Sequence, residues 1–453
     1  MPFRFGMAEM TELPHLILEL EVEVDGRAER GLAADGLAPK WFTKDPDTSI
    51  EEDRRQLLDV IDQACEIALR VGSAPTVFAF WRELYDEQLR VGEAAGHPPL
   101  LTGLGASLVE RAVIDAYCRA TSTTFSRALR DGGLGLRLGD LHPELRDREP
   151  RELLPRHPRD SIRIRHTVGL SDPLTDSEVS ADEGMDDGLP LSLEACIGAY
   201  GLTHFKLKLF GDAKDDLERL RAIVRVLEAR APSFVFTLDG NERFPALADF
   251  REFWAALQAE RRLTPAFERL LFVEQPVRRE AALSVEAERT LTEWRDGPPL
   301  VVDESDETVE SVSRALACGY SGTSYKNCKG VFKGVANACL IQHRRESDRT
   351  TCLIVSAEDL SNIGPIALLQ DSAAVAALGI AHAERNGHHY FTGLSMFSAD
   401  IQELALRHHG DLYQRHQRGF ATLAIERGDI SLVSVNRAPF GYEPALAQHL
   451  LGA

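Results

Sequence analysis

Residues 160–405 show a repeating pattern in which a short apolar run is followed by a segment with helical spacing. The apolar runs predict strands at 162–168, 203–209, 234–239, 270–274, 299–303, 322–326, 351–356 and 389–395. Between the second and third runs, Leu217, Leu220, Val224 and Leu227 fall on one face of a helix. Strands that alternate with helices indicate a parallel sheet, and eight such units indicate a closed α/β barrel of the (β/α)8 type.

The first part of the chain has a different pattern. Residues 15–24 alternate as a strand, turn-forming residues predict a long loop over 25–49, and helical spacing recurs at 51–71, 75–92 and 105–120. A strand followed by helices predicts a region that is organised separately from the barrel.

Three carboxylates end three successive apolar runs of the repeating region. Asp239 ends FVFTLD, Glu274 ends LFVE and Asp303 ends PLVVD, at spacings of 35 and 29 residues. Because barrel active sites lie at the carboxyl ends of the strands, we expect these acids to meet at one site. An acidic set without His or Cys suits a hard cation such as Mg²⁺. Each acid taken alone has a commoner role as a helix N-cap.

Lysines bracket this acidic series. Lys206 and Lys208 in HFKLK precede it by one unit, and Lys326 in GTSYK follows it by one unit. A lysine acts as a general base only where burial and nearby positive charge lower its pKa towards neutrality. A KxK pair taken alone is more often a solvated strand face. Lys329 and Lys333 are interpreted as solvated residues at the start of the following helix.

The order of these motifs resembles the enolase superfamily, specifically its muconate-lactonising enzyme subgroup, which includes dipeptide epimerases, N-acylamino acid racemases and o-succinylbenzoate synthases. The matching motifs are KLK at 206–208, DGN at 239–241, EQP at 274–276, DES at 303–305 and the late Lys326. Enzymes of this superfamily use a Lys or His base together with Mg²⁺. The resemblance therefore implies Mg²⁺ as the cofactor and a small-molecule carboxylate as the substrate.

The resemblance also implies a role for each motif residue. Lys208 would be the base on one face of the substrate, Lys206 its electrostatic partner, and Lys326 the acid or base on the opposite face. The implied metal ligands are Asp239, Glu274 and Asp303, with Asn241 and Glu304 as supporting groups around them.

Further residues are candidates for contact with the substrate. Trp41 and Phe42 lie on a loop that the superfamily folds over the pocket, and burial in the core of the first region is their alternative. Glu358 or Asp359 would bond the substrate or Lys326, and the alternative is a surface acid in a loop. The expected eighth strand, HHYFTGLSMF, lacks the DxD with which dipeptide epimerases hold an ammonium group. An amine-blocked amino acid or a related carboxylate is therefore favoured as the substrate.

The overall organisation follows from the same resemblance. It implies a modified (β/α)8 TIM barrel over 160–405, an N-terminal α+β capping domain over 1–135, and a C-terminal segment, 406–453, that returns to the cap. The superfamily often has seven regular barrel units and one irregular unit. It also has one more cap strand before a PFRFG-like segment, so the first cap strand is expected to be missing or replaced.

The favoured reaction is racemisation or epimerisation through an enediolate, because a base on each face permits removal and return of a proton with inversion. A cycloisomerase or dehydratase, which is a lyase-type reaction, is the alternative. A non-catalytic barrel protein is the third reading, and the intact set of acids and lysines argues against it.

The composition of the chain argues against some classes of binding partner. A net charge of −20 argues against a nucleic-acid or membrane surface, both of which favour clustered Lys and Arg. Seven cysteines without a CxxC pair, and an N-terminus without a signal-peptide pattern, predict a cytoplasmic protein. We also expect a homo-oligomer.

Residues 172–190 hold seven acids and no base, which predicts a solvated loop or a lid.

Overall fold

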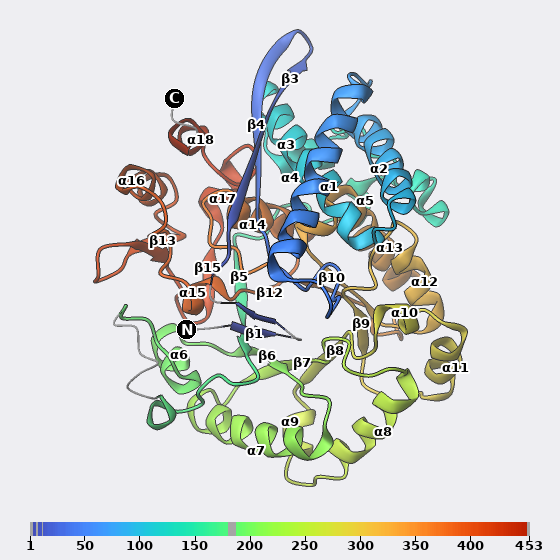
Figure 1. The fold of residues 1–453 in the computed structure, drawn as a ribbon, viewed down its shortest axis with the longest axis vertical. Helices are drawn as coiled ribbons and strands as arrows, with labels where there is room; N and C mark the ends of the chain where they lie inside the picture. Colours follow the sequence, from blue (N-terminus) through green and yellow to red (C-terminus); the bar gives the residue numbers. More distant parts are fainter. Residues whose placement is uncertain (1–2, 6–7, 11, 180–186, 451–453) are drawn as a thin grey trace.

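The structure is a computed structural model that describes residues 3–5, 8–10, 12–179 and 187–450. Its centre is a closed barrel of eight parallel strands, in which the last strand pairs with the first (Figure 1). In barrel order the strands are β5 (Ser161–Val168), β6 (His204–Lys208), β7 (Val235–Asp239), β8 (Leu270–Glu274), β9 (Leu300–Val302), β10 (Gly322–Tyr325), β11 (Ile354–Ala357) and β12 (His382–Glu384). The predicted α/β barrel is confirmed.

The predicted position of the eighth strand is wrong. The strand is His382–Glu384, whereas the expected segment begins within a short helix, α15 (Gly387–Tyr390). Three residues with a single apolar side chain, Ala383, carry too little periodicity to predict a strand. The aromatic residues after Gly387 give the pattern of a strand in the sequence, although the first of them belong to a helix.

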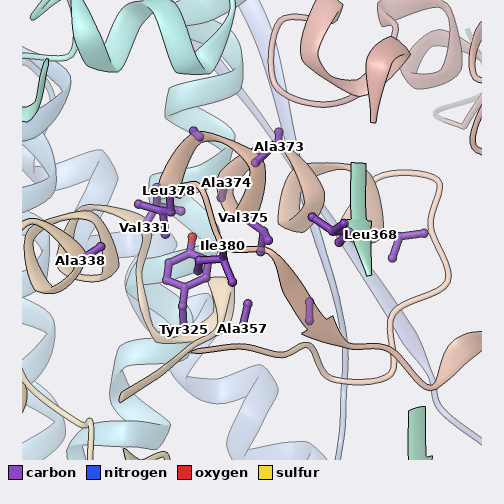
Figure 2. Close-up of a cluster of buried hydrophobic side chains, with 14 of the residues drawn as sticks. Tyr325, Val331, Ala338, Ala357, Leu368, Ala373, Ala374, Val375, Leu378 and Ile380 are labelled. Atoms are coloured by element: carbon purple, nitrogen blue, oxygen red, sulfur yellow. The ribbon is translucent and has the colours of Figure 1, made fainter. Parts of the chain in front are cut away.

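Helices cover the outside of the barrel (Figure 1). They are α6 (Leu193–Tyr200), α7 (Ala213–Arg230), α8 (Leu247–Gln258), α9 (Thr264–Phe267), α10 (Arg279–Ala282), α11 (Val285–Glu293), α12 (Ser311–Cys318), α13 (Val331–Ser347), α14 (Ala367–Leu378) and α16 (Ala399–His408). α14 is buried along its whole length. Figure 2 shows the packing that holds it, with Val375 and Leu378 of α14 beside Tyr325 of β10 and Ala357 of β11.

A cap of one hairpin and three long helices lies over one end of the barrel (Figure 1). Its elements are β3 (His15–Val24), β4 (Arg27–Gly36), α1 (Ile50–Val71), α2 (Val77–Ala94) and α3 (Pro99–Ala120), followed by the short helices α4 (Phe125–Arg130) and α5 (Pro150–Leu153). Separately, β1 (Phe3–Phe5) pairs with β2 (Ala8–Met10).

The long loop predicted over 25–49 is wrong in its first half. β4 pairs with β3 along its full length, so only residues 37–49 form a loop. The sequence of β4 is rich in Ala and Gly because α3 packs directly on it. A Cβ atom on Gly31 would lie 1.9 Å from the carbonyl oxygen of Ala112. Small residues of this kind weaken the strand signal in the sequence.

The last elements that the structure describes follow the barrel, and one of their residues contacts the cap. β13 (Tyr413–Arg415) pairs with β14 (Ala421–Leu423), β15 (Asp429–Ser431) pairs with β5, and α17 (Val433–Arg437) and α18 (Pro444–Leu450) follow. The Tyr442 hydroxyl donates to Asp115 Oδ2 of α3 at 2.5 Å. The domain boundaries drawn from the sequence stay predictions. Among the described residues, no helix has both the length and the apolar character needed to cross a bilayer.

The acidic stretch 172–190 falls partly outside the described residues, which omit 180–186. Asp172, at its start, is not solvated as expected. It is buried and accepts hydrogen bonds from the Gly169 amide at 2.7 Å and the Tyr390 hydroxyl at 2.8 Å.

Candidate active site

Eight of the predicted site residues line one pocket at the carboxyl ends of the barrel strands, whereas Glu274, Glu304 and Phe42 do not line it. From the predicted set, the pocket is lined by Trp41, Lys206, Lys208, Asp239, Asn241, Asp303, Lys326 and Glu358, and it also includes Ala38, Asp359, Leu360, Ser361, Glu384 and Asn386. The walls are therefore mostly charged groups from the strand ends, and the cap contributes Ala38 and Trp41.

The Lys206 ammonium lies at the centre of a group of carboxylates. Its Nζ is 2.9 Å from Asp239, 3.1 Å from Glu274, 2.8 Å from Glu358 and 2.7 Å from Glu384. Burial alone would lower the pKa of Lys206, but the negative charges around it, Asp239 first, raise that pKa well above its ordinary value. Lys206 is therefore a permanent cation in this arrangement.

Each of the other two predicted lysines makes its shortest contact with a different acid. Lys208 Nζ lies 2.6 Å from Asp239 Oδ2, and Lys326 Nζ lies 2.6 Å from Asp303 Oδ2. Three strands separate β6, which carries Lys208, from β10 in either direction around the barrel. Lys326 directly follows β10, so the two amines belong to opposite sides of the barrel mouth.

The charge around Lys326 keeps it protonated in this arrangement. Burial alone would lower its pKa, but the carboxylates of Asp303 and Glu358, the second 3.1 Å from its Nζ, raise that pKa well above its ordinary value. The contact between Glu358 and Lys326 is one of those expected from the sequence.

The acids fit a hard divalent cation. Glu274, Asp303 and Glu358 each offer one oxygen, and these oxygens lie within 4.8 Å of one another. Glu274 Oε2 is buried and has no hydrogen-bond partner among the described residues. Burial, and then the charge of Glu358, raise the pKa of Glu274 well above its ordinary value. A cation at this point would remove the repulsion that raises it.

Asp239 differs from the other two predicted ligands. Its Oδ2 faces both Lys206 and Lys208, and Glu358 takes its place in the group of three carboxylates whose oxygens lie within 4.8 Å of one another. Asn241 stands beside it, with its backbone amide 2.8 Å from Asp239 Oδ1.

Gln275 fixes the start of the DES segment. Its Oε1 accepts hydrogen bonds from the backbone amides of Asp303 at 2.8 Å and Ser305 at 3.3 Å, and its Nε2 donates to Ser305 Oγ at 2.8 Å. Gln275 has a φ of 34°, in the left-handed region that few non-glycine residues adopt. The EQP motif therefore orients Asp303 from the neighbouring strand.

The loop 37–49 of the cap is fastened over the pocket. Arg279 of α10 donates to the carbonyl oxygens of Trp41 at 3.0 Å and Phe42 at 2.7 Å, and it also pairs with Glu242. Trp41 lines the pocket, where its ring lies 4.4 Å from Lys326 Nζ. Phe42 is 2% exposed and belongs to the apolar core of the cap.

Lys44 completes this fastening. Its Nζ lies 2.8 Å from Glu304 and 2.5 Å from Glu242. Glu304 is thus a buried partner of the cap loop. Sequence reasoning missed Lys44, Glu242 and Arg279, because no local pattern indicates a contact between segments that are far apart in the chain.

Lys329 and Lys333 are not solvated, and that prediction is wrong. Lys329 Nζ lies 3.0 Å from Asp303 Oδ1, and Lys333 Nζ lies 2.9 Å from Asp306 Oδ1. Gly330, with a φ of 104°, turns the chain just before α13 begins. The first turn of α13 therefore faces the buried acids rather than solvent.

Glu384 is not identified as a site residue from the sequence, because the pattern predicts the eighth strand at 389–395 instead of His382–Glu384. This acid ends β12, pairs with Lys206 and accepts hydrogen bonds from Thr167 and from Asn386, the latter at 3.0 Å. The amine-free substrate was favoured because HHYFTGLSMF lacks a DxD, but that segment is not the eighth strand; β12 itself reads HAE, which has no DxD and ends in one acid. A surface location for Glu358 and Asp359 is also wrong, because both are buried and Asp359 pairs with Arg385 at 2.6 Å.

The sequence of this region matches that of a known protein family. Residues 192–329 match the family described as enolase C-terminal domain-like, and this segment runs from α6 to the lysines that follow β10. The resemblance to the enolase superfamily is confirmed. No similar sequence was found among curated proteins.

Solved structures share the fold of this chain. A mandelate racemase/muconate lactonizing enzyme from Bordetella bronchiseptica is 14% identical, with 98% of this chain and 97% of that chain covered and a TM-score of 0.57. A muconate lactonizing enzyme from Pseudomonas fluorescens, complexed with muconolactone, is 16% identical, with 97% and 91% covered and a TM-score of 0.56. A dipeptide epimerase from Enterococcus faecalis is 13% identical, with 94% and 98% covered and a TM-score of 0.54.

Proposed function

We propose that the protein is a Mg²⁺-dependent enzyme that removes a proton next to a substrate carboxylate and forms an enediolate, acting as a two-lysine racemase or epimerase. The observation that carries the proposal is the placement of Lys208 and Lys326 on opposite sides of the barrel mouth, with a carboxylate cluster between them. The racemases and epimerases among the structural neighbours use the same fold.

Each lysine has a defined task in this reaction. The neutral form of one amine takes the α-proton from one face, and the protonated form of the other returns a proton to the opposite face. Lys206 stays charged because several carboxylates surround it, so it balances the pocket and does not act as a base. Mg²⁺, held by Asp239, Glu274 and Asp303, would supply positive charge for the substrate carboxylate as it gains a second negative charge.

The cap loop protects this chemistry from water. Arg279 and Lys44 hold residues 37–49 against the barrel, and Trp41 closes one side of the pocket. Exclusion of water strengthens the electrostatic interactions inside an active site and protects reactive intermediates. The substrate class is a small α-substituted carboxylic acid, and both acylated and free α-amino acids belong in the test because Glu384 lines the pocket.

A cycloisomerase or lyase is the second candidate, and one observation favours it. Lys326 is held between Asp303 and Glu358, whose charges raise its pKa well above the ordinary value. A lysine that stays protonated throughout would stabilise negative charge and leave Lys208 as the single base.

Isotope exchange separates the two mechanisms. A panel of N-acylated amino acids, dipeptides and cyclic acids, followed by polarimetry, identifies a substrate. Each enantiomer is then incubated in D₂O with wild type, Lys208→Ala or Lys326→Ala, and incorporation is followed by NMR. A racemase loses exchange of one enantiomer in each variant, by about 10²- to 10⁴-fold.

Lys214→Ala, at an exposed position of α7, is the matched control and should exchange both enantiomers at the wild-type rate. Exchange of only one enantiomer by wild type, lost in Lys208→Ala and retained in Lys326→Ala, would favour the lyase. Wild-type exchange of both enantiomers in either active-site variant would refute the two-base assignment.

A further inference from the structure

Three histidines form a buried cluster outside the active-site pocket. His166 lies on β5, and His388 and His389 lie on α15, which Figure 1 shows next to the barrel. One ring nitrogen from each lies within 4.8 Å of the other two, and His166 Nδ1 is 2.9 Å from His388 Nε2. None of the three lines the pocket.

The strand geometry places His166 on the opposite face of β5 from the active site. Its neighbours Arg165 and Thr167 point into the barrel, where they contact Glu358 and Glu384. Since successive side chains of a strand point to opposite faces, His166 points outward. The cluster therefore lies between the barrel wall and α15.

Ordinary core packing leaves part of this cluster unexplained. His389 is 1% exposed, and neither of its ring nitrogens has a hydrogen-bond partner among the described residues. A buried polar group without a partner is destabilising. Burial lowers the pKa of His166 and His389 well below the ordinary value and that of His388 to about 3. All three rings are therefore neutral near pH 7, which is the form that binds metals.

The spacing of the rings suits one ion. With Zn–N bonds of about 2.0–2.1 Å and tetrahedral angles, two imidazoles on one ion have ring centroids about 5 Å apart. The observed separations are 5.1 Å between His166 and His388, 5.0 Å between His388 and His389, and 4.3 Å between His166 and His389. Two of the three separations match, and the third requires a small rotation of one ring.

We propose that His166, His388 and His389 bind one transition-metal ion of the Zn²⁺ class. Imidazole nitrogens select such ions, whereas the carboxylates in the pocket suit Mg²⁺, so the two sites differ in chemistry as well as in place. The ion joins β5 to α15. Glu384 and Asn386, which directly precede α15, line the pocket, so the ion stabilises one wall of the active site without touching the substrate.

Metal titration with an optical readout tests the proposal without reference to activity. Protein freed of metals by a chelator is saturated with Mg²⁺ and titrated with Co²⁺, whose visible absorption reports a tetrahedral nitrogen site. We expect one equivalent of Co²⁺ to bind and Zn²⁺ to displace it, and Zn²⁺ should raise the Tm. His389→Phe, which keeps the ring shape, should abolish both effects, while Asp303→Asn should leave them intact.

His204→Gln is the matched control, because His204 packs against His382 and pairs in register with Arg165, so its side chain lies on the opposite face of the sheet from His166. It should bind Co²⁺ as wild type does. Absence of the tetrahedral absorption in wild type overturns the proposal, as does its survival in His389→Phe or its loss in Asp303→Asn. If His389→Phe does not fold, His388→Asn serves in its place with the same expected result.

Discussion

At the scale of single residues, the pocket is organised by the balance of buried charge. Five carboxylates and four lysines lie in mutual contact: Asp239, Glu274, Asp303, Glu358 and Glu384 with Lys206, Lys208, Lys326 and Lys329. Each buried charge is costly unless it has a partner, so removal of one member changes the state of the others. The sensitivity of the metal site to each acid follows from this coupling.

Calorimetric titration of Mg²⁺ should separate the contributions of the acids. Glu274→Gln and Asp303→Asn each remove a carboxylate from the group formed by Glu274, Asp303 and Glu358, so we expect each to weaken Mg²⁺ binding about 10-fold or more. Asp239→Asn and Glu358→Gln decide the third ligand, because the motif assigns Asp239 whereas the distances favour Glu358. The variant with the larger loss identifies that ligand.

Asp215→Asn, exposed on α7, is the control and should bind Mg²⁺ as wild type does. Undiminished Mg²⁺ binding in all four pocket variants would show that the cation does not use these acids.

The metal-site residues that the sequence predicted share one property: each stands in a short motif at the end of an apolar run. Asp239, Glu274 and Asp303 meet because strand ends of a barrel meet, and this follows from the repeat alone. Glu384 ends a strand of three residues that has no such run before it. Lys329 sits in a turn whose direction depends on Gly330, and no periodicity predicts that direction.

At the scale of elements, the loop 37–49 depends on groups from the barrel for its position. Arg279 supplies two hydrogen bonds to loop carbonyls, and Lys44 supplies the ion pair with Glu304. The sequence predicted a loop where β4 lies, because the side chains of β4 are small; the same small side chains let α3 pack close to the strand.

Hydrogen exchange should reveal this fastening. Arg279→Met removes the donors to Trp41 and Phe42, and hydrogen bonds from charged groups contribute about 1.5–3 kcal/mol. We expect amides of residues 37–49 to exchange about 10-fold faster or more in this variant, with α1 unchanged. A turned-over carboxylate should restore part of the protection.

Arg289→Met, exposed on α11, serves as the comparison and should exchange as wild type does. Equal protection of residues 37–49 in Arg279→Met and wild type would mean that the hydrogen bonds from Arg279 do not hold the loop.

At the scale of the whole molecule, the cap meets the rest of the chain through buried polar contacts. Gln370 Nε2 of α14 donates to the Leu32 carbonyl of β4 at 2.7 Å. Glu110 of α3 accepts hydrogen bonds from the amides of Val331 at 2.9 Å and Phe332 at 2.6 Å, at the start of α13. Barrel closure follows from counting repeats, but these contacts join segments about 200 or more residues apart, which no local pattern specifies.

Glu110 should make the stability of the molecule depend on pH. Burial raises the pKa of its carboxyl from 4.5 to about 7. Between these values the folded chain binds more protons than the unfolded chain, so the free energy of unfolding falls as pH rises through this window and levels off above it. At about 1.4 kcal/mol for each pKa unit, the contribution approaches roughly 3 kcal/mol.

Glu110→Gln removes this titration while keeping an oxygen that accepts one of the two amides of α13. We therefore expect the Tm of wild type to fall relative to that of the variant between pH 5 and pH 8, with most of the relative change complete by about pH 7.5. Glu66→Gln, exposed on α1, should follow wild type across the range. Parallel Tm profiles for wild type and Glu110→Gln would contradict the assignment, because a carboxyl that ionises equally in both states has no effect on the slope.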